Sequence, residues 1–229
     1  MYSHAAVHPH DGNTADVLRG PLVRGGVQPM PEFTSVKEYF RDNYGIDNEG
    51  LLAELELVTK VRPIKKGEIL MEPGEVPKDV LFQAGGITRC FFYDDRGRDH
   101  TESFSGQYNL PIMPCGGLGE PSDSYMEVLV SGIILAIPVN WVQEAIFRYP
   151  EIQKLMYQLL ADSAKANAEM RRVLYHHDAR QRFEWFNERF PDACAGVSQK
   201  YAASFLNMSQ ETYSRIKREF MKKEQECLE

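Results

Sequence analysis

Apolar and small residues recur at helical spacing between Glu151 and His177. The stripe consists of Ile152, Leu155, Met156, Leu159, Leu160, Ser163, Ala166, Asn167, Met170, Val173, Leu174 and His177. Positions three and four apart share one helix face, so the pattern predicts a long helix over 151–178. Such a helix is too long to bury its stripe alone, which favours pairing with a second copy in which Asn167 sets the register. A single helix packed on its own domain is the alternative.

Short runs rich in β-branched and aromatic residues precede that helix. Ile87 to Tyr93 and Val128 to Ile137 are two such runs, and clusters of Gly, Pro and Asp punctuate them. The tetrad Asp94-Asp95-Arg96-Gly97 is typical of a hairpin turn. The pattern predicts an all-β module of about a hundred residues.

Near the end of the chain the pattern changes to two short helices and a tight turn, within 197–218. Ser198 and Ser209 suit the two helix starts, because a serine hydroxyl can accept an orphan backbone N–H. Asn207 suits the turn between them. The segment therefore predicts a helix-turn-helix.

The second of these helices has two unlike faces. Three apolar residues at three- and four-residue spacing can be buried together: Tyr213, Ile216 and Phe220. Polar residues fall on the opposite side: Glu211, Ser214, Arg215 and Arg218. One face is predicted to pack and the other to remain free.

The free face has the chemistry of a DNA-reading helix. Arg215 can grip O6 and N7 of guanine, Glu211 can accept from N4 of cytosine, and Ser214 can approach a thymine methyl or a phosphate. Lysines would contact phosphates, which adds affinity without sequence information: Lys217, Lys222 and Lys223. The candidate DNA-binding residues are Ser209, Gln210, Glu211, Ser214, Arg215, Lys217, Arg218 and Lys222. Spacing alone leaves open an ordinary helical hairpin with a solvated charged face.

The net charge of −7 argues at first against a nucleic-acid partner. Its distribution changes the picture, because Val197 to Lys223 holds six Lys or Arg against two Glu. The acidic part can face away from DNA, and charges beyond a Debye length of roughly 8 Å contribute little.

Composition indicates a reduced, cytoplasmic chain. Four cysteines are scattered without paired spacing, which favours free thiols over disulfides, zinc or an iron–sulfur cluster: Cys90, Cys115, Cys194 and Cys227. No apolar run reaches the roughly 20 residues that span a bilayer, and no signal peptide is visible. The first thirty or so residues, rich in Gly, Pro and His, are predicted to be a flexible arm.

The C-terminal part contains three recognisable segments: Ala179 to Phe183 through Phe190-Pro191, Ala202 to Leu206, and Glu211 to Arg215. In these segments it resembles the Crp/Fnr superfamily of bacterial transcription regulators, and the resemblance covers nearly everything from about Phe33 onward. The Glu-x-x-Ser-Arg pattern of the last segment is similar to the Fnr-type recognition helix, which reads half-sites of the TTGA kind. The resemblance implies reading roles for Glu211, Ser214 and Arg215. The cysteine group of oxygen-sensing Fnr proteins is missing, and Met221 to Glu229 is too short for the β-hairpin wing of many members.

Upstream, the chain resembles the double-stranded β-roll that this superfamily shares with cyclic-nucleotide-binding proteins. The similar segments are Lys66 to Leu70, Glu72 to Gly74 and Val80 to Arg89. Members that bind cyclic AMP pair the cyclic phosphate with an Arg, yet Gly106 to Met126 contains no Arg or Lys here. A buried phosphate would lack its counter-charge, so control by cyclic AMP is not expected.

Two metalloenzyme patterns are approached but not completed. His100-Thr101-Glu102 followed by Pro114-Cys115 approaches the zinc-deaminase pattern, but Leu118 replaces the second cysteine. A cupin-like metalloenzyme needs several histidines around one ion, and His100 is the only histidine in the predicted roll. No catalytic residue, cofactor or metal is predicted.

The sequence thus predicts an α+β fold in four parts. These are a flexible arm over 1–30, a double-stranded β-roll effector domain over 31–150, a dimerisation helix over 151–178 and a helix-turn-helix with a truncated wing over 179–229. The predicted function is sequence-specific DNA binding that regulates transcription, controlled by an unknown small-molecule or redox signal. Expected partners are double-stranded DNA with a palindromic site, a second copy of the chain, RNA polymerase and a small-molecule effector, but no membrane. A β-roll signalling protein without DNA binding and a cupin-like metalloenzyme are the alternatives.

Overall fold

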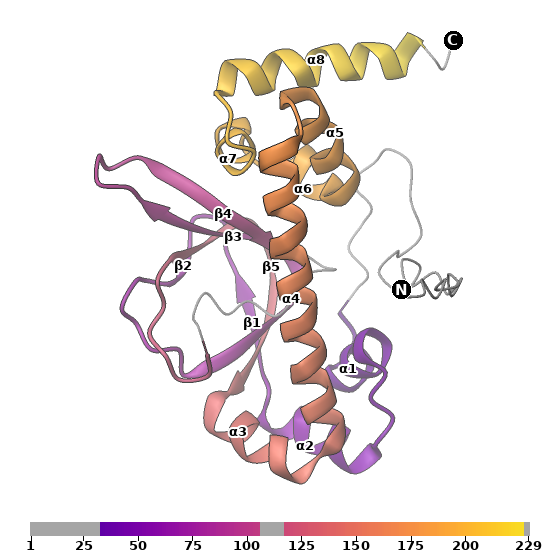
Figure 1. Ribbon diagram of the computed structural model, residues 1–229. Coiled ribbons are helices and arrows are strands. Elements are labelled where there is room, and N and C mark those ends of the chain that lie inside the picture. Colours follow the sequence, from indigo (N-terminus) through magenta and orange to yellow (C-terminus); the bar gives the residue numbers. More distant parts are fainter. Residues whose placement is uncertain (1–32, 106–116, 227–229) are drawn as a thin grey trace, which may run out of the picture.

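A computed structural model describes residues 33–105 and 117–226, with side chains up to Lys223. The predicted arm over 1–30, the stretch 106–116 with its Cys115, and Cys227 lie outside the described residues. The described residues form a curled antiparallel sheet, a long helix that runs along it, and a group of short helices at one end (Figure 1).

The elements follow one another as helices, strands and helices. Two helices come first: α1 (Val36–Tyr44) and α2 (Glu49–Val58). The strands are β1 (Lys60–Ile64), β2 (Ile69–Met71), β3 (Asp79–Tyr93), β4 (Asp99–Ser105) and β5 (Tyr125–Pro138). The remaining helices are α3 (Val139–Arg148), α4 (Pro150–His176), α5 (Ala179–Arg189), α6 (Pro191–Gly196), α7 (Gln199–Phe205) and α8 (Gln210–Glu226).

The prediction of an all-β module of about a hundred residues overlooked helices, because α1 and α2 precede the strands and α3 follows them directly. The hydroxyl of Ser35 accepts the backbone N–H of Glu38 at 3.1 Å and caps α1. Val36 and Phe40 then face the core. A serine followed three residues later by a glutamate is a helix-start signal, which a search for β-rich runs overlooks.

The strands confirm the predicted β-roll. They form one antiparallel sheet in the order β1-β5-β3-β4, with β2 also paired to β5. The predicted runs Ile87–Tyr93 and Val128–Ile137 lie within β3 and β5, which pair with each other. Asp94 to Gly97 forms the predicted hairpin turn, in which Gly97 has a φ of 72°.

A glycine contact interrupts the regular pairing of β3 with β5. The register shifts between Gln83 and Thr88, and Gly86 has a φ of 87°. A Cβ atom on Gly86 would lie 2.5 Å from the carbonyl oxygen of Val130, and one on Gly132 would collide with the backbone of Gly85. The two strands therefore approach each other at a bulge that only glycine can occupy.

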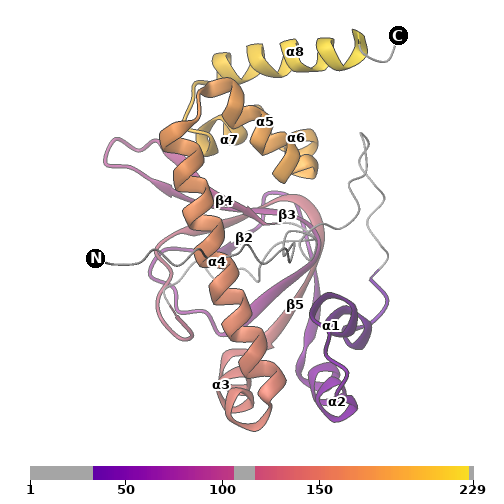
Figure 2. The ribbon, with the colours of Figure 1, turned by 45° about the vertical axis from the view of Figure 1, so that its right-hand side comes forward.

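This bulge changes which residues of β3 face outward. Before it, the even-numbered Val80, Phe82 and Ala84 pack in a core cluster with α1 to α4. After it, the odd-numbered Ile87 packs in a second cluster with α5 to α8. The register shifts reverse the in-out alternation of β3, so a single outer surface of the sheet meets both groups of helices. In Figure 2 the two groups lie at opposite ends of the sheet.

The other face of the sheet lines the inside of the roll. Its buried residues are Ile64, Met71, Leu81, Cys90, Met126, Val128, Ile134 and Ala136. Burial raises the pKa of the Cys90 thiol to about 11, so this thiol is protonated and unreactive near neutral pH. Among the described residues, Cys90 and Cys194 are buried and are not joined in a disulfide.

Helix α4 confirms the predicted long helix, and its stripe meets two environments. One part is buried within the chain: Ile152, Leu155, Leu159 and Val173. Leu160, by contrast, is 63% exposed, and Tyr157 and Tyr175 elsewhere on α4 are 75% and 80% exposed. The helix packs on its own domain with one face and leaves a second apolar face uncovered in the single chain.

Replacement of Gly86 by alanine is expected to lower the free energy of unfolding by about 2 kcal/mol or more, because it adds a backbone collision to the strain of a positive φ. Gly67→Ala is the matched control: Gly67 has a φ of 85° but open space around it, and should cost only about 1 kcal/mol. Urea unfolding followed by circular dichroism measures both. Equal losses would contradict the close approach of β3 and β5.

Candidate DNA-binding interface

The turn between α7 and α8 is built by local hydrogen bonds. Asn207 has a φ of 50°, a left-handed conformation that asparagine tolerates. The hydroxyl of Ser209 accepts the N–H of Thr212 at 3.2 Å, which confirms the predicted cap of α8. The turn and the start of the second helix are therefore set by the sequence that surrounds them.

The prediction that the Ser198 hydroxyl caps α7 was wrong, although the position of the helix start was correct. Ser198 does occupy the position before α7, yet among the described contacts its hydroxyl makes no capping hydrogen bond. The first turn is tight, and the N–H of Tyr201 donates to the Ser198 carbonyl at 3.0 Å. This is one of the N–H groups that a serine cap can take, and here it is bonded to the backbone instead.

The apolar face of α8 is buried as predicted. Tyr213 is 1% exposed and Ile216 5% exposed. Phe220 packs against the same cluster, with its ring centroid 5.4 Å from that of Phe183 in α5. Because this face is fixed against α5, the opposite face of α8 points outward.

We call that outward side the reading face; it comprises Gln210, Glu211, Ser214, Arg215, Lys217, Arg218 and Lys222. Ser214 and Lys217 are half-buried and the other five are exposed. Four of its residues line a groove of about 460 Å³: Ser214, Lys217, Arg218 and Lys222. Gln199 at the start of α7 and Met221 complete the groove, and sequence patterns had not indicated either residue. The groove is lined by cationic and neutral groups, which suits an anionic partner.

Two charged residues of the reading face, Glu211 and Arg215, have partners close to them on α8. A hydrogen bond from its own backbone N–H at the helix start, together with one from Ser209, lowers the pKa of Glu211. Arg215 pairs with Glu219 one turn along the helix, at 3.1 Å. Both partners of this pair are more than half exposed, so it is worth only a few tenths of a kcal/mol and does not prevent Arg215 from reaching another acceptor.

Lys217 has a role inside the domain as well as a place in the groove. Its ammonium donates to the carbonyl oxygen of Cys194 at 2.6 Å. Cys194 lies in the last turn of α6, where carbonyl groups lack helical partners. The sequence prediction placed Lys217 among the phosphate ligands and did not foresee this contact.

Arg182 is a further structural residue that sequence patterns did not single out. Its Nε donates to the carbonyl of His177 at 3.0 Å, and its Nη1 donates to the carbonyls of Leu206 at 3.0 Å and Asn207 at 3.2 Å. These bonds tie the end of α4 to the turn between α7 and α8. Two of the three acceptors lie 24 and 25 residues away in the chain, so no local pattern could reveal them.

Metal ligands and membrane-spanning helices can be sought only in the described residues, which do not include Pro114 and Cys115. Within them, no group of three or more His, Cys, Asp or Glu side chains could hold a metal ion. His100 lies 3.1 Å from Asp94 in the β3–β4 hairpin. No helix in the described ranges combines the length and the apolar character needed to cross a membrane.

Comparison with known proteins finds relatives that are named as regulators. No family model matches the chain. It is 22% identical to the transcriptional activator protein Anr of Pseudomonas protegens, over 74% of this chain and 73% of that protein. It is also 22% identical to the fumarate and nitrate reduction regulatory protein of Escherichia coli, over 76% of this chain and 74% of that protein. The solved structure of FixK2 from Bradyrhizobium japonicum shares its fold, with a TM-score of 0.64 at 14% identity over 72% of this chain and 86% of FixK2.

The Arg182→Leu variant is expected to lose about 2 kcal/mol of unfolding free energy, because three carbonyl groups lose their donor. Arg180→Leu is the matched control on the same helix, since Arg180 forms only an exposed pair with Glu184, and its loss should be much smaller. Chemical denaturation monitored by tryptophan fluorescence distinguishes them. A loss at Arg180 as large as at Arg182 would refute the anchoring role.

Proposed function

We propose that this member of the Crp/Fnr superfamily of transcription regulators binds a palindromic DNA duplex as a homodimer and thereby controls transcription. Its relatives and its fold confirm the superfamily that the sequence predicted. The site residues and the partners named below are our proposal.

One observation carries the proposal: α8 is anchored by a buried apolar face and presents a polar, largely exposed face of defined composition. In helix-turn-helix proteins the second helix lies in the major groove while the first crosses the backbone. α8 and α7 have this order and are joined by the turn at Asn207.

Base recognition falls to three residues of the reading face. Arg215 donates in a bidentate manner to guanine, and Glu211 accepts from the amino group of cytosine. Ser214 lies between them along the helix and is small enough to allow close approach to a thymine methyl. Glu211 is ionised because of its place at the helix start, which suits it as an acceptor.

Phosphate contacts come from the groove between α7 and α8. Arg218 and Lys222 supply positive charge there, and Gln199 lies at the start of α7, which crosses the backbone in the proposed complex. The segment from Val197 to Lys223 is locally basic although the whole chain carries −7. The charge distribution therefore orients the helix-turn-helix toward the duplex.

The second copy is proposed to pair along α4. Tyr157, Leu160 and Tyr175 form an exposed apolar face on the side of α4 that its own domain does not cover. Pairing of two such faces would relate the two helix-turn-helix units by a two-fold axis. Each unit would then bind one of two half-sites about 34 Å apart, in successive major grooves. The palindromic site follows from this symmetry.

For the signal, we favour a small-molecule effector in the β-roll over oxidation of Cys90, because the raised pKa keeps that thiol protonated. Cyclic AMP is not the effector we propose, since Gly106 to Met126 provides no cation for its phosphate. RNA polymerase is the proposed partner at the promoter, in the cytoplasm.

Selection from random duplexes, followed by titration of the selected site, tests DNA recognition. Arg215→Ala should reduce the preference for the selected site over random DNA by about 1 to 3 kcal/mol. Lys222→Ala should instead weaken binding to all sequences alike and lower the slope of log K against log salt by about 1. Unchanged preference in Arg215→Ala would remove its assigned role, and failure to select any sequence would contradict DNA reading altogether.

A charge placed in the exposed face of α4 should separate the two copies. Leu160→Asp is expected to shift the chain to monomer in sedimentation experiments, because an unpaired carboxylate cannot be buried in an apolar interface. Phe147→Asp is the matched control, since Phe147 is 91% exposed on α3 and lies outside the proposed interface. A dimer that persists in Leu160→Asp would refute pairing along this face.

A further inference from the structure

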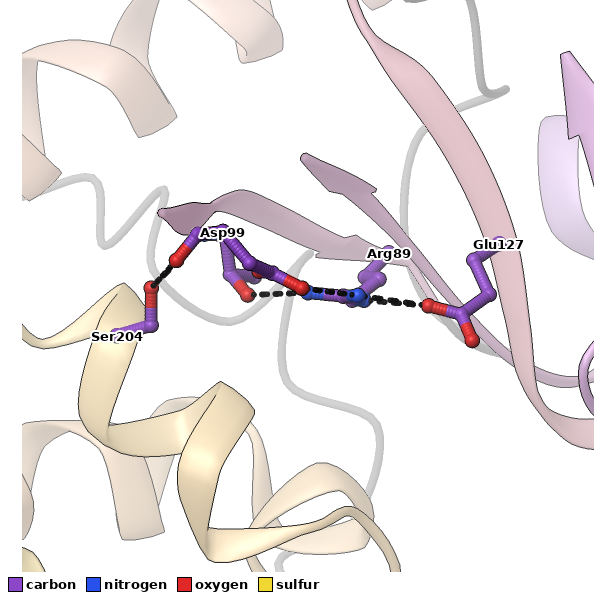
Figure 3. A network of polar contacts seen from close by, with 5 residues as sticks. Arg89, Asp99, Glu127 and Ser204 are labelled. Atoms are coloured by element: carbon purple, nitrogen blue, oxygen red, sulfur yellow. Dashed lines mark hydrogen bonds and ion pairs between the residues drawn. The ribbon is translucent and has the colours of Figure 1, made fainter. Parts of the chain in front are cut away.

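A hydroxyl group of the helix that precedes α8 forms hydrogen bonds with the backbone of the sheet. The Oγ of Ser204 in α7 accepts the backbone N–H of Thr101 at 3.0 Å and donates to the backbone carbonyl of Asp99 at 3.3 Å. Both backbone groups belong to β4 (Figure 3). Residues more than a hundred positions apart in the sequence are joined here.

Strand β4 is the last strand in the order β1-β5-β3-β4, so one side of it has no paired strand in the described sheet. The N–H and carbonyl groups on such an edge need partners or water. Ser204 satisfies one donor and one acceptor on that edge, as a residue of a further strand would. α7 therefore covers the sheet edge in one defined position along β4.

A buried arginine lies beneath this contact. Arg89 is 2% exposed, and its guanidinium forms a bidentate pair with Asp99 at 2.7 and 2.8 Å. Its Nε donates to Glu127 at 2.8 Å, and its Nη1 also donates to the hydroxyl of Thr101 at 3.1 Å. Burial alone would lower the pKa of Arg89, but the bonds and charges of Asp99 and Glu127 outweigh it and raise that pKa. The group stays charged and its direction is fixed by acceptors on two other strands.

The ring of Tyr201 completes the site from the side of α7. The guanidinium carbon of Arg89 lies 3.6 Å from the ring centroid of Tyr201 and 4.0 Å from that of Phe91. A cation that lies over an aromatic ring and is removed from water is attracted to the electron-rich face of that ring. α7 thus contributes one aromatic ring and one hydroxyl, three residues apart, to a polar site that β3, β4 and β5 build.

We propose that this contact, the α7–β4 clasp (Arg89, Asp99, Thr101, Tyr201 and Ser204), fixes the orientation of the helix-turn-helix on the β-roll and so selects the distance between the two DNA half-sites. The proposal rests on the proposed function. Tyr201 and Ser204 are positioning residues, because they act on DNA through the placement of α8.

Two features make the clasp compatible with bound DNA. The reading face of α8 remains exposed while α7 is clasped, so the contact does not hide the residues that meet bases. The chain enters this group of helices through His177 and Asp178, between α4 and α5. A contact on α7, away from that link, restricts rotation of the group about the link.

A fixed orientation has a measurable consequence for a dimer. When two helix-turn-helix units are held rigidly and one binds its half-site, the other has a high effective concentration at the second half-site of a correctly spaced palindrome. Two units that turn freely lose that advantage. Binding of one unit to a single half-site depends only on α8 and its neighbours. Loss of the clasp should therefore affect spacing and avidity and leave half-site recognition intact.

The experiment uses the full chain with the double substitution Tyr201→Leu and Ser204→Ala. The rescue variant, Tyr201→Phe with Ser204→Thr, keeps the ring and the hydroxyl. Arg98→Ala is the control on the same hairpin, because Arg98 pairs with Asp94 at the exposed turn. Three measurements are made on each: hydrogen exchange of the Thr101 amide, affinity for a palindromic duplex selected with the unmodified chain, and affinity for a duplex with one half-site.

In the double variant we expect exchange at Thr101 to accelerate about tenfold or more, since its only acceptor among the described contacts is lost. Affinity for the palindrome should fall about tenfold, and duplexes with one or two base pairs added between half-sites should be bound nearly as well as the original. Affinity for the single half-site should stay within about twofold. The rescue variant and Arg98→Ala should behave like the unmodified chain.

Either of two results overturns the proposal. One is unchanged exchange at Thr101, which would show that Ser204 does not hold the edge of β4 in solution. The other is faster exchange with unchanged spacing preference, which would reduce the clasp to a stabilising contact. Failure of the unmodified chain to bind any duplex would instead refute the proposed function, and the spacing role with it, whatever the exchange data show.

Discussion

The outer surface of β3 is the constraint on which the rest of the structure depends. A regular strand would alternate its side chains without interruption and would turn Ile87 and Arg89 toward the inside of the roll. The bulge at Gly86 reverses that alternation, so both residues face the C-terminal helices. One sheet surface thereby holds the N-terminal helices and α4 at one end and the helix-turn-helix at the other.

Two kinds of interaction hold the helix-turn-helix at its end of the sheet, and they contribute differently. Phe104 of β4 packs against Phe186 and Phe205, with ring centroids 5.8 and 5.1 Å apart, and such burial supplies free energy with little directional preference. The buried charge of Arg89 contributes less net stability, because its desolvation offsets much of the attraction to its carboxylates. The Arg89 network contributes mainly to geometry, because its fixed donors and acceptors permit one orientation of α7.

Helix α4 connects this junction to the proposed second copy. Its inner face belongs to the core cluster that α1 to α3 share with the sheet, and its outer face carries exposed apolar residues in the single chain. Arg182 then joins the end of α4 to the turn before α8. A change in how the roll holds α4 or β4 would reach α8 through these few contacts, because the elements between them are regular helices and strands.

The sequence by itself determined what depends on neighbouring residues: α4, the main strands, the cap at Ser209, the turn at Asn207 and the exposed face of α8. Periodicity and capping act over three or four positions, so they can be recognised in the chain. It indicated the superfamily through the same local motifs. The tertiary structure decided the hydrogen-bond partners of Lys217, Arg182 and Ser204, the unused hydroxyl of Ser198 and the division of the α4 stripe. These depend on groups brought together from distant segments, with Thr101 and Ser204 separated by 103 positions, and no local pattern encodes which distant group a side chain will meet.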